Sequence, residues 1–599
     1  MDLTAALKNC FDSKPGNDPV VLELDLSRGV LTSAPSSPLV ALRMRNATTM
    51  RALRDALRHA ANANNVAGLV VHVGPHPLPA AIGDEVAELI TEFSAARPTI
   101  AWSESFGELS NATLAYRVAS AASEIWLQPS GSLGLNGVSA QILLLRGLFE
   151  KVGLEPEFAQ RKEYKSAAEQ FAGTEVSDAN REMTTRLAES ILEDTIKVVA
   201  ERRRVEPAKV REIVDASPVT ATAALEAGLV DKLGYRDEVY ADLKRRWGRM
   251  PPGDGVRVEH STDGRPTDDD KADTGTVFLQ YAHRYARAHG EKPWESLFNR
   301  TRPAIAVVNV NGPIVTGPSH AGGPGGNQAG SDTVAAHLRE AGRDDKVKAV
   351  ILRVDSPGGS YIASDVIRRE VLQLKKSGRP VIASMGGVAA SGGYFVSMGA
   401  DAIVANPTTL TGSIGVLAGQ FVSDELYGKL DLVRERINAG ANAGFLGGAR
   451  FSQAQWDTLN KWLDDVYADF TTKAAADRGL DLEVLEPLAR GRVWTGADAH
   501  AKGLVDELGG MATAIDLAAE RVGMNRDELQ LRGVPAVPWL DQVKPAESSE
   551  SGTTATVASP SLAELLNSGP EGILSGLAQL AGIPARQGVL SLPWDVRIG

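Results

Sequence analysis

The sequence is poor in residues that build covalent or metal-based frameworks. Its 599 residues include a single cysteine, Cys10. One cysteine excludes an intramolecular disulfide framework and any multi-cysteine metal site, and it fits a reducing compartment. We therefore expect neither a metal nor a cofactor.

Positive charge is also scarce. The chain has 63 Lys and Arg residues against 75 Asp and Glu residues, which gives a formal net charge of −12. Proteins that bind nucleic acid neutralise phosphates with clustered Lys and Arg, usually in excess over acidic residues. We expect no nucleic-acid partner.

Long hydrophobic runs are missing as well. The first residues, "MDLTAALKNCFDSKPGNDPVVLELDL", lack the basic region and apolar core of a secretory signal. No segment supplies the roughly 18 uninterrupted apolar residues of a membrane span. With 43% hydrophobic and 23% charged residues, the composition is that of an ordinary globular protein. We expect a cytoplasmic or peripherally membrane-associated protein.

An internal repeat is the strongest organisational feature that is present. The stretch "LEAGLVDKLGYRDEV" (225–239) returns as "HAKGLVDELGGMATA" (500–514). Likewise "LRHAANANNVAGLVVHVG" (57–74) matches "LREAGRDDKVKAVILRVD" (338–355), and further pairs keep the same order at an offset near 281 residues. Self-similarity at a long fixed offset predicts a tandem duplication of one domain.

Both copies alternate Val/Ile-rich runs with stretches whose apolar residues recur at helical spacing, which predicts an α/β fold. We expect an N-terminal repeat over 1–246, a linker or excursion over 247–303 and a C-terminal repeat over 304–532. A low-complexity spacer and a tail follow over 533–599. The tail could contact a membrane surface or a sister subunit, although docking on the chain's own domains is the simpler alternative.

Ser391 stands in "GGVAASGGYF" (386–395), where every near neighbour is small. Small neighbours would leave the serine open from outside and let a substrate carbonyl approach a backbone amide, as a nucleophile requires. The alternative is a tight turn that needs small residues for packing. In the first copy Thr113 takes the place of Ser391.

Lys165 shows the reverse pattern. It lies in "RKEYKSAAEQF" (161–171) of the first copy, and a small residue, roughly Ala443, takes its place in the second. No histidine lies beside the Ser391 motif, and a lysine can serve as the base if it is neutral. At its reference pKa of about 10.4, only about one lysine in 2,500 is neutral at pH 7, so burial would have to lower the pKa. Taken alone, Lys165 would be read as a surface lysine.

Together, "SPGGS" (356–360), the Ser391 and Lys165 motifs and the two GLVD-LG stretches resemble the signal peptide peptidase A family, also called protease IV, in its long two-repeat form. The resemblance runs from about residue 20 to about residue 530. It implies a fold related to the Clp protease and crotonase families, so the fold class is a tandem duplication of a Clp protease/crotonase-like domain.

The resemblance also implies the roles of individual residues. Ser391 would be the nucleophile and Lys165 the general base of a Ser/Lys dyad. Gly358 or Gly359, together with Gly392, would donate N–H groups to the oxyanion. Ser413, in "TGSIG", matches a hydroxyl that orients the lysine.

The family's substrates imply peptide partners, above all the remnants of cleaved signal peptides. Family members assemble into rings, so the resemblance implies a homotetramer with one composite site per chain. Membrane-bound members carry an N-terminal anchor that is not seen here, which puts a periplasmic location in doubt. Peripheral membrane contact stays open.

Two other functions remain alternatives. A crotonase-type acyl-CoA enzyme would share the glycine-based oxyanion site, but it would need a carboxylate near the glycine turns and no split serine and lysine. A degenerate scaffold that binds membrane proteins would not need to keep Ser391, Lys165 and both glycine turns.

Overall fold

The computed structural model describes residues 18–32, 48–74, 78–249, 275–289, 301–323, 326–440, 442–534 and 590–591. Cys10, most of the expected linker and nearly all of the tail lie outside the described residues. The chain forms two compact units, the first made of Met1–Gly137 and Thr195–Glu295, the second of Val138–Asp194 and Ser296–Ile598.

Unit 1 is built on a six-stranded parallel sheet in the order β10-β6-β5-β4-β1-β11. Buried side chains alternate along its strands: Val21, Val70 and Ile100 pack against α11, while Leu22 and Leu69 are buried on the opposite face. Both faces are therefore covered, as parallel sheets require. Its main elements are β1 (Val20–Asp25), α3 (Met50–Asn62), β4 (Val66–His72), α4 (Ala80–Ala96), β5 (Thr99–Ser103), α5 (Thr113–Ala119), β6 (Glu124–Leu127), α9 (Pro207–Ala216), α10 (Ala221–Glu226), β10 (Lys232–Leu233), α11 (Arg236–Trp247), β11 (Phe278–Tyr281) and α12 (Ala282–His289).

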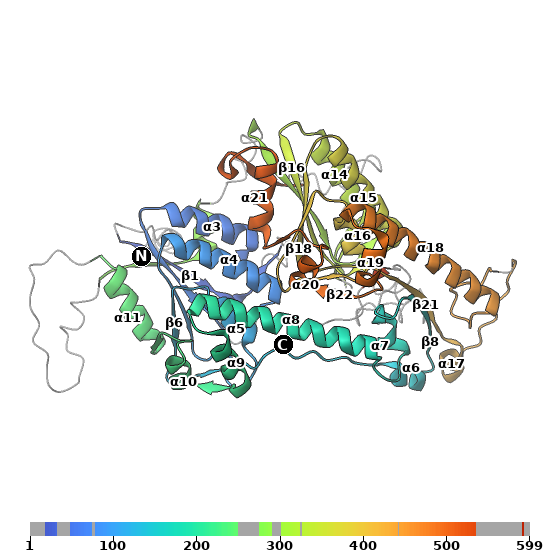
Figure 1. Cartoon of the computed structure of the whole chain (residues 1–599), viewed down its shortest axis with the longest axis horizontal. Helices are drawn as coiled ribbons and strands as arrows, with labels where there is room; N and C mark the ends of the chain where they lie inside the picture. The colour runs from blue at the N-terminus through green and yellow to red at the C-terminus, as the bar shows by residue number, and fades with distance from the viewer. Residues whose placement is uncertain are drawn as a thin grey trace, which may run out of the picture. The chain divides into compact units, whose positions relative to one another are not determined.

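Unit 2 contains an eight-stranded sheet, parallel except for the antiparallel pair β20–β22. Helices α14 and α15 cover one face of this sheet and α21 covers the other (Figure 1). Its main elements are β12 (Ala304–Asn311), α14 (Ser331–Arg343), β16 (Val347–Ser356), α15 (Tyr361–Lys376), β18 (Val381–Ala390), α16 (Gly392–Ser397), β19 (Ala402–Ala405), β20 (Leu410–Gly412), α18 (Gln453–Arg478), α19 (Leu482–Leu488), β22 (Val493–Thr495), α20 (Gly496–Ala501), β23 (Glu507–Leu508), α21 (Met511–Arg521) and β24 (Gln530–Gly533).

The strand order confirms the duplication. Unit 2 contains the order β23-β19-β18-β16-β12-β24, which repeats the unit 1 order strand for strand. The GLVD stretch makes the same two hydrogen bonds in both units: its aspartate accepts the N–H of the second residue of a strand, and its leucine carbonyl accepts the hydroxyl of a buried tyrosine. These bonds are Ile125 N to Asp231 at 2.7 Å and Tyr116 Oη to Leu229 O at 2.5 Å, and Ile403 N to Asp506 at 2.7 Å and Tyr394 Oη to Leu504 O at 3.1 Å.

Unit 2 also contains smaller sheets. One has the order β14-β15-β13-β17-β25, made of His320–Gly323, Gly326–Gly330, Ile314–Val315, Gly358–Gly359 and Leu590–Ser591. Another is the antiparallel pair of β8 (Glu155–Arg161) and β21 (Val416–Val422). Further short helices of this unit are α6 (Arg146–Val152), α7 (Glu169–Ala172) and α17 (Asp424–Lys429).

The compact units do not coincide with the sequence repeats over residues 138–194. This segment comes from the first repeat but packs within unit 2, and the boundary falls inside α8 (Asp178–Arg203). Side chains of α8 hold it there: Arg186 forms a two-point ion pair with Asp498, both bonds 2.9 Å, and the Ser190 and Thr495 hydroxyls lie 2.7 Å apart. Lys165 therefore belongs to the same compact unit as Ser391.

Candidate active site

Ser391 occupies a sharp turn between a strand and a helix. Strand β18 ends at Ala390, and α16 begins at Gly392. The turn gives Ser391 a φ of 56° and a ψ of −113°, a conformation that non-glycine residues rarely adopt. Its N–H donates to Gly412 O at 2.8 Å, which fixes the turn to β20. Such strained residues cluster at functional sites.

The side chain of Ser391 is not open to solvent, contrary to the expectation drawn from its small neighbours. Its exposed fraction is 0%. The small residues that flank it let other parts of the chain pack closely: a Cβ added at Gly392 would lie 3.1 Å from Gly358 Cα and from Gly359 N. The close packing that these residues permit therefore encloses the serine.

Lys165 reaches this turn because of the pairing between β8 and β21. The register sets Arg161 opposite Val416 and continues antiparallel to Glu155 opposite Val422. Lys165 follows β8 and Ser413 precedes β21, so the pairing brings the chain segments that carry both residues to the same end of the ribbon. This neighbourhood joins residues about 250 positions apart in the sequence.

The three side chains make one hydrogen-bonded cluster. Lys165 Nζ lies 2.8 Å from Ser391 Oγ, 2.9 Å from Ser413 Oγ and 3.1 Å from Ser413 O. A neutral lysine has two N–H donors and one lone pair. Its donors suit the two Ser413 oxygens, which leaves the lone pair to accept the Ser391 hydroxyl proton.

The electrostatic setting favours that neutral form. Lys165 has an exposed fraction of 0%, and burial holds the pKa of its ammonium group well below the ordinary value. Among the described residues, no carboxylate forms an ion pair with it. Burial without a compensating negative charge disfavours the ammonium form. A general base must be neutral, so this environment suits that role.

The glycines expected to bind the oxyanion lie beside the serine. Gly358 and Gly359 form β17 with φ angles of 107° and 151°, a region that side chains other than hydrogen avoid. Gly359 pairs with Ile314 of β13, and the Gly358 N–H donates to Ser356 Oγ at 3.2 Å. The N–H of Gly392 belongs to the first turn of α16, where N–H groups have no acceptor within the helix.

Gly491 is a site residue that sequence reasoning missed. Its φ is 82°, and a Cβ added there would lie 2.5 Å from both the N and the Cβ of Lys165. The two residues that flank Gly491 bind the backbone beside Lys165 and that of Ser413. Tyr164 N donates to Arg490 O at 3.2 Å, and Ser413 N donates to Arg492 O at 2.7 Å. The only signal in the sequence is a glycine between two arginines in "ARGRVW".

The counterparts of the dyad in the sister repeats are not arranged for the same chemistry. Thr113 is the first residue of α5, and its hydroxyl donates to Asn111 at 2.7 Å and accepts from Gly137 N at 3.0 Å. Ala443 lies on the surface of unit 2. Each repeat thus carries one member of the hydrogen-bonded pair of Lys165 and Ser391.

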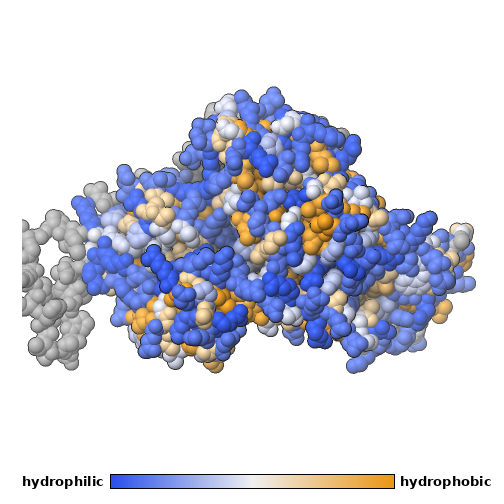
Figure 2. All heavy atoms as spheres, viewed as in Figure 1, coloured by the Kyte–Doolittle hydropathy of each residue, from blue (hydrophilic) through white to orange (hydrophobic). Residues whose placement is uncertain are grey.

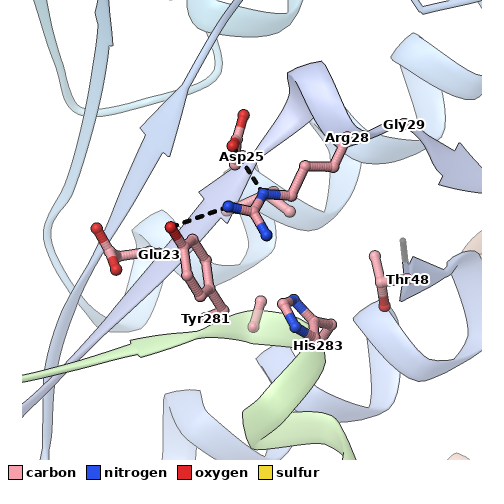
Figure 3. A pocket seen from close by; sticks show the side chains of 9 residues that line it. Glu23, Asp25, Arg28, Gly29, Thr48, Tyr281 and His283 are labelled. Atoms are coloured by element: carbon pink, nitrogen blue, oxygen red, sulfur yellow. Dashed lines mark hydrogen bonds and ion pairs between the residues drawn. The ribbon is translucent and has the colours of Figure 1, made fainter. Parts of the chain in front are cut away.

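No histidine among the described residues forms a hydrogen bond with Ser391. His72, in unit 1, lies between Asp25 at 3.2 Å and Glu104 at 2.9 Å. Nearby, a small polar pocket lined entirely by unit 1 residues holds Arg28, which donates to Asp25 and to Tyr281 Oη (Figure 3).

His283 also lines this unit 1 pocket (Figure 3). Burial and neighbouring arginines lower the pKa of His283 to about 4, so its imidazole is neutral near pH 7. Within the described residues, no group of three or more His, Cys, Asp and Glu side chains could hold a metal ion. None of the described helices is long and apolar enough to cross a membrane.

Comparison with known proteins places this site in a family. The pattern of peptidase family S49 matches residues 92–248 and 373–525, one stretch in each sequence repeat. The chain belongs to peptidase family S49. Membership in a peptidase family counts against the acyl-CoA alternative.

Individual relatives support the assignment. This S49 chain is 34% identical over 417 residues to "Serine protease SPPA, chloroplastic" of Arabidopsis thaliana, which covers 68% of this chain and 57% of the relative. It is 31% identical to "Protease 4" of Salmonella typhi, covering 78% of this chain and 71% of the relative. "Protease 4" of Haemophilus influenzae is 30% identical, covering 74% of this chain and 68% of the relative.

Proposed function

We propose that this chain is a serine endopeptidase that uses a dyad of Ser391 and Lys165 to hydrolyse apolar peptides, with the remnants of cleaved signal peptides as the substrate class. The distance of 2.8 Å between Lys165 Nζ and Ser391 Oγ, at a lysine with no exposed surface, carries the proposal. Membership in family S49 and the names of the relatives support it.

In the first step, neutral Lys165 takes the proton of the Ser391 hydroxyl while Oγ attacks the carbonyl carbon of the scissile peptide bond. The tetrahedral intermediate collapses to an acyl-enzyme, and the lysine ammonium returns its proton to the leaving amine. Water then attacks the ester with Lys165 again as base, which releases the acid product and restores Ser391.

The developing oxyanion needs preorganised N–H donors. The N–H of Gly392 comes from the first turn of α16, and the second donor comes from Gly358 or Gly359. Helix α16 has only six residues, so we assign the stabilisation to these local N–H groups and not to a helix dipole.

The substrate would bind extended, adding as a strand beside β17 by backbone hydrogen bonds in the position where β25 now pairs with it. Pairing through the backbone accepts many side chains but needs an extended chain, which unfolded signal-peptide remnants offer and folded proteins do not.

A fluorogenic apolar peptide tests the proposal. Ser391→Ala should lower kcat by at least about a thousandfold with little change in thermal midpoint, since it removes one small atom. Thr113→Ala, at the sister position in unit 1, is the matched control and should keep kcat within a few-fold. Equal activity of Ser391→Ala and the wild type would refute the proposal.

A homotetramer and peripheral membrane contact stay predictions. Unit 2 exposes apolar side chains around α17 and after it: Leu430 is 54%, Val433 99% and Ile437 91% exposed. On the face drawn in Figure 2, by contrast, hydrophilic residues cover most of the surface and hydrophobic residues form separate patches. Light scattering of the full chain that gave an active monomer would refute the tetramer.

A further inference from the structure

Arg492 belongs to a cluster of charged and aromatic side chains beside Lys165. Its Nη1 lies 2.9 Å from Oε1 of Glu182, a residue of α8. The other carboxylate oxygen, Oε2, accepts the hydroxyl of Tyr164 at 2.8 Å. The guanidinium lies over the Tyr164 ring at 4.7 Å and over the Trp494 ring at 4.5 Å. The arginine is therefore held by one carboxylate and two aromatic rings.

The backbone of this cluster contacts both Lys165 and Ser413. Tyr164 immediately precedes Lys165 in the chain. A Cβ on Gly491, next to Arg492, would lie 2.5 Å from Lys165 N. The carbonyl of Arg492 accepts the Ser413 N–H at 2.7 Å. The ion pair therefore belongs to the chain segments that hold the buried amine and the serine that binds it.

Glu182 is a carboxylate that would favour a charged lysine. The hydrogen bond from Tyr164 and the ion pair with Arg492 hold the pKa of Glu182 below its usual value, so it is ionised near neutral pH. A carboxylate close to a lysine stabilises the ammonium form. The positive charge of Arg492, which arginine never loses in proteins, offsets this effect. Burial accordingly sets the direction in which the pKa of Lys165 is shifted.

Other charged groups around the lysine segment are paired as well. Ser391 and Ser413, which contact the amine, carry no charge. Further titratable groups on the segment and on the elements packed against it are Glu163 with Arg490, Arg161 with Asp464, Lys162 with Glu486, Glu169 with Asn180, and Tyr467, whose hydroxyl accepts the Arg490 N–H. Arg492 is better buried than Arg490, 15% against 39% exposed, and it stacks on the residue next to the lysine.

We propose that Arg492 is a positioning residue that acts through Lys165: by pairing with Glu182, it prevents that carboxylate from stabilising the lysine ammonium. This role rests on the proposed function of Lys165 as the base, although the effect of the ion pair on the amine does not. Removing the cation should shift the acid limb of catalysis in one direction, and removing the carboxylate should shift it in the other.

Two single charge removals test the sign. Arg492→Gln leaves Glu182 without its cation, so the midpoint of the acid limb of kcat/KM for an apolar peptide should rise by about 0.5 pH unit. Glu182→Gln leaves the arginine unpaired, and the midpoint should fall by a similar amount. The double variant Arg492→Gln/Glu182→Gln should return to the wild-type midpoint. An ionic strength of about 10 mM, where the Debye length is about 30 Å, keeps the effect from being screened.

Two controls separate charge from packing. Arg492→Lys keeps the positive charge but loses the planar stack on its aromatic neighbours, so its midpoint should stay at the wild-type value even where kcat falls. Arg526→Gln breaks a matched ion pair, that of Arg526 with Asp516 at 2.6 Å, which joins α21 to the turn after it. These side chains are 22% and 57% exposed, against 15% and 57% for Arg492 and Glu182. The midpoint of Arg526→Gln should equal that of the wild type.

The titration of Lys165 makes the test independent of turnover. In proteins that also carry Ser391→Ala, NMR of lysines labelled with ¹³C at the ε carbon should show the same two opposite shifts. If no variant hydrolyses peptide, the proposed function fails, and this titration still decides whether the ion pair acts on the amine.

Three outcomes overturn the role of Arg492. An unchanged midpoint in Arg492→Gln would make the arginine a packing residue only. A rise that the added Glu182→Gln does not reverse would mean that the carboxylate is not what the arginine offsets. If Arg492→Gln does not fold, Glu182→Gln decides the matter at an exposed carboxylate, and a midpoint that stays or rises there refutes the proposal.

Discussion

Gly491→Ala tests how tightly Lys165 must be positioned. The added Cβ would lie 2.5 Å from Lys165 N and Cβ, whereas ordinary van der Waals contact begins at 3.4 Å, so one of the two backbones must move by about 0.9 Å. Displacing a catalytic group by about 1 Å can cost about 100-fold in rate. We expect kcat/KM for an apolar peptide to fall about 100-fold.

The control must carry the same backbone strain without the collision. Gly378, after the end of α15, has a φ of 79° and nothing within 4 Å of an added Cβ. Both alanine variants should lose about 1 kcal/mol of stability from the left-handed backbone, and Gly491→Ala should lose more because of the collision. Only Gly491→Ala should lose activity; equal kcat/KM in the two variants would refute the idea that Gly491 sets the position of the lysine.

Two further predictions concern the base and its partner. Lys165→Met and Lys165→Arg should both lose activity at least about a thousandfold, since neither can accept the serine proton. Relative to the wild type, the thermal midpoint at pH 7 should rise in Lys165→Met, which removes the buried amine. It should fall in Lys165→Arg, because arginine stays charged in its place. The folded-state pKa of Lys165 lies well below its unfolded value of about 10.4, so folding releases a proton between the two. Wild-type stability should therefore rise with pH across that interval, and Lys165→Met should lose this dependence; an unchanged slope would contradict the burial argument. Ser413→Ala should lower kcat about fivefold with little change in KM, because one hydrogen bond worth about 1 kcal/mol is lost while the Ser413 carbonyl still holds the amine at 3.1 Å. A change confined to KM would point to a role in substrate binding.

The duplication and the proximity of Ser391 and Lys165 could be predicted from the sequence because one copy serves as a reference for the other. The GLVD stretches make the same hydrogen bonds in both units, so both copies keep the same residues. This makes the repeat visible in the sequence. Ser391 and Lys165 stand out for the opposite reason, as each is replaced in the sister repeat. Neither inference needs any knowledge of how distant segments pair.

The rest depended on long-range pairing, which local patterns do not encode. That residues 138–194 pack within unit 2 follows from the register of β8 with β21 and from contacts of α8, not from any periodicity. The burial of Ser391 could not be foreseen, because small neighbours allow close packing as readily as open access. Gly491 looks like any loop glycine until Lys165 is found beside it, and Leu590–Ser591 lies in a tail that has no distinctive pattern.

If Lys165 acts as a neutral base, the pH profile of catalysis must follow the titration of its amine. The pH dependence of kcat/KM reports the pKa of the essential base in the free enzyme. That midpoint should be compared with the titration of Lys165 followed by NMR of lysines labelled with ¹³C at the ε carbon, assigned by its absence in Lys165→Met. We expect a single shared midpoint, well below the ordinary lysine value, with activity falling tenfold per pH unit on its acid side. If Lys165 titrates near pH 10.5, or if the kinetic midpoint differs from its titration, Lys165 is not the neutral base.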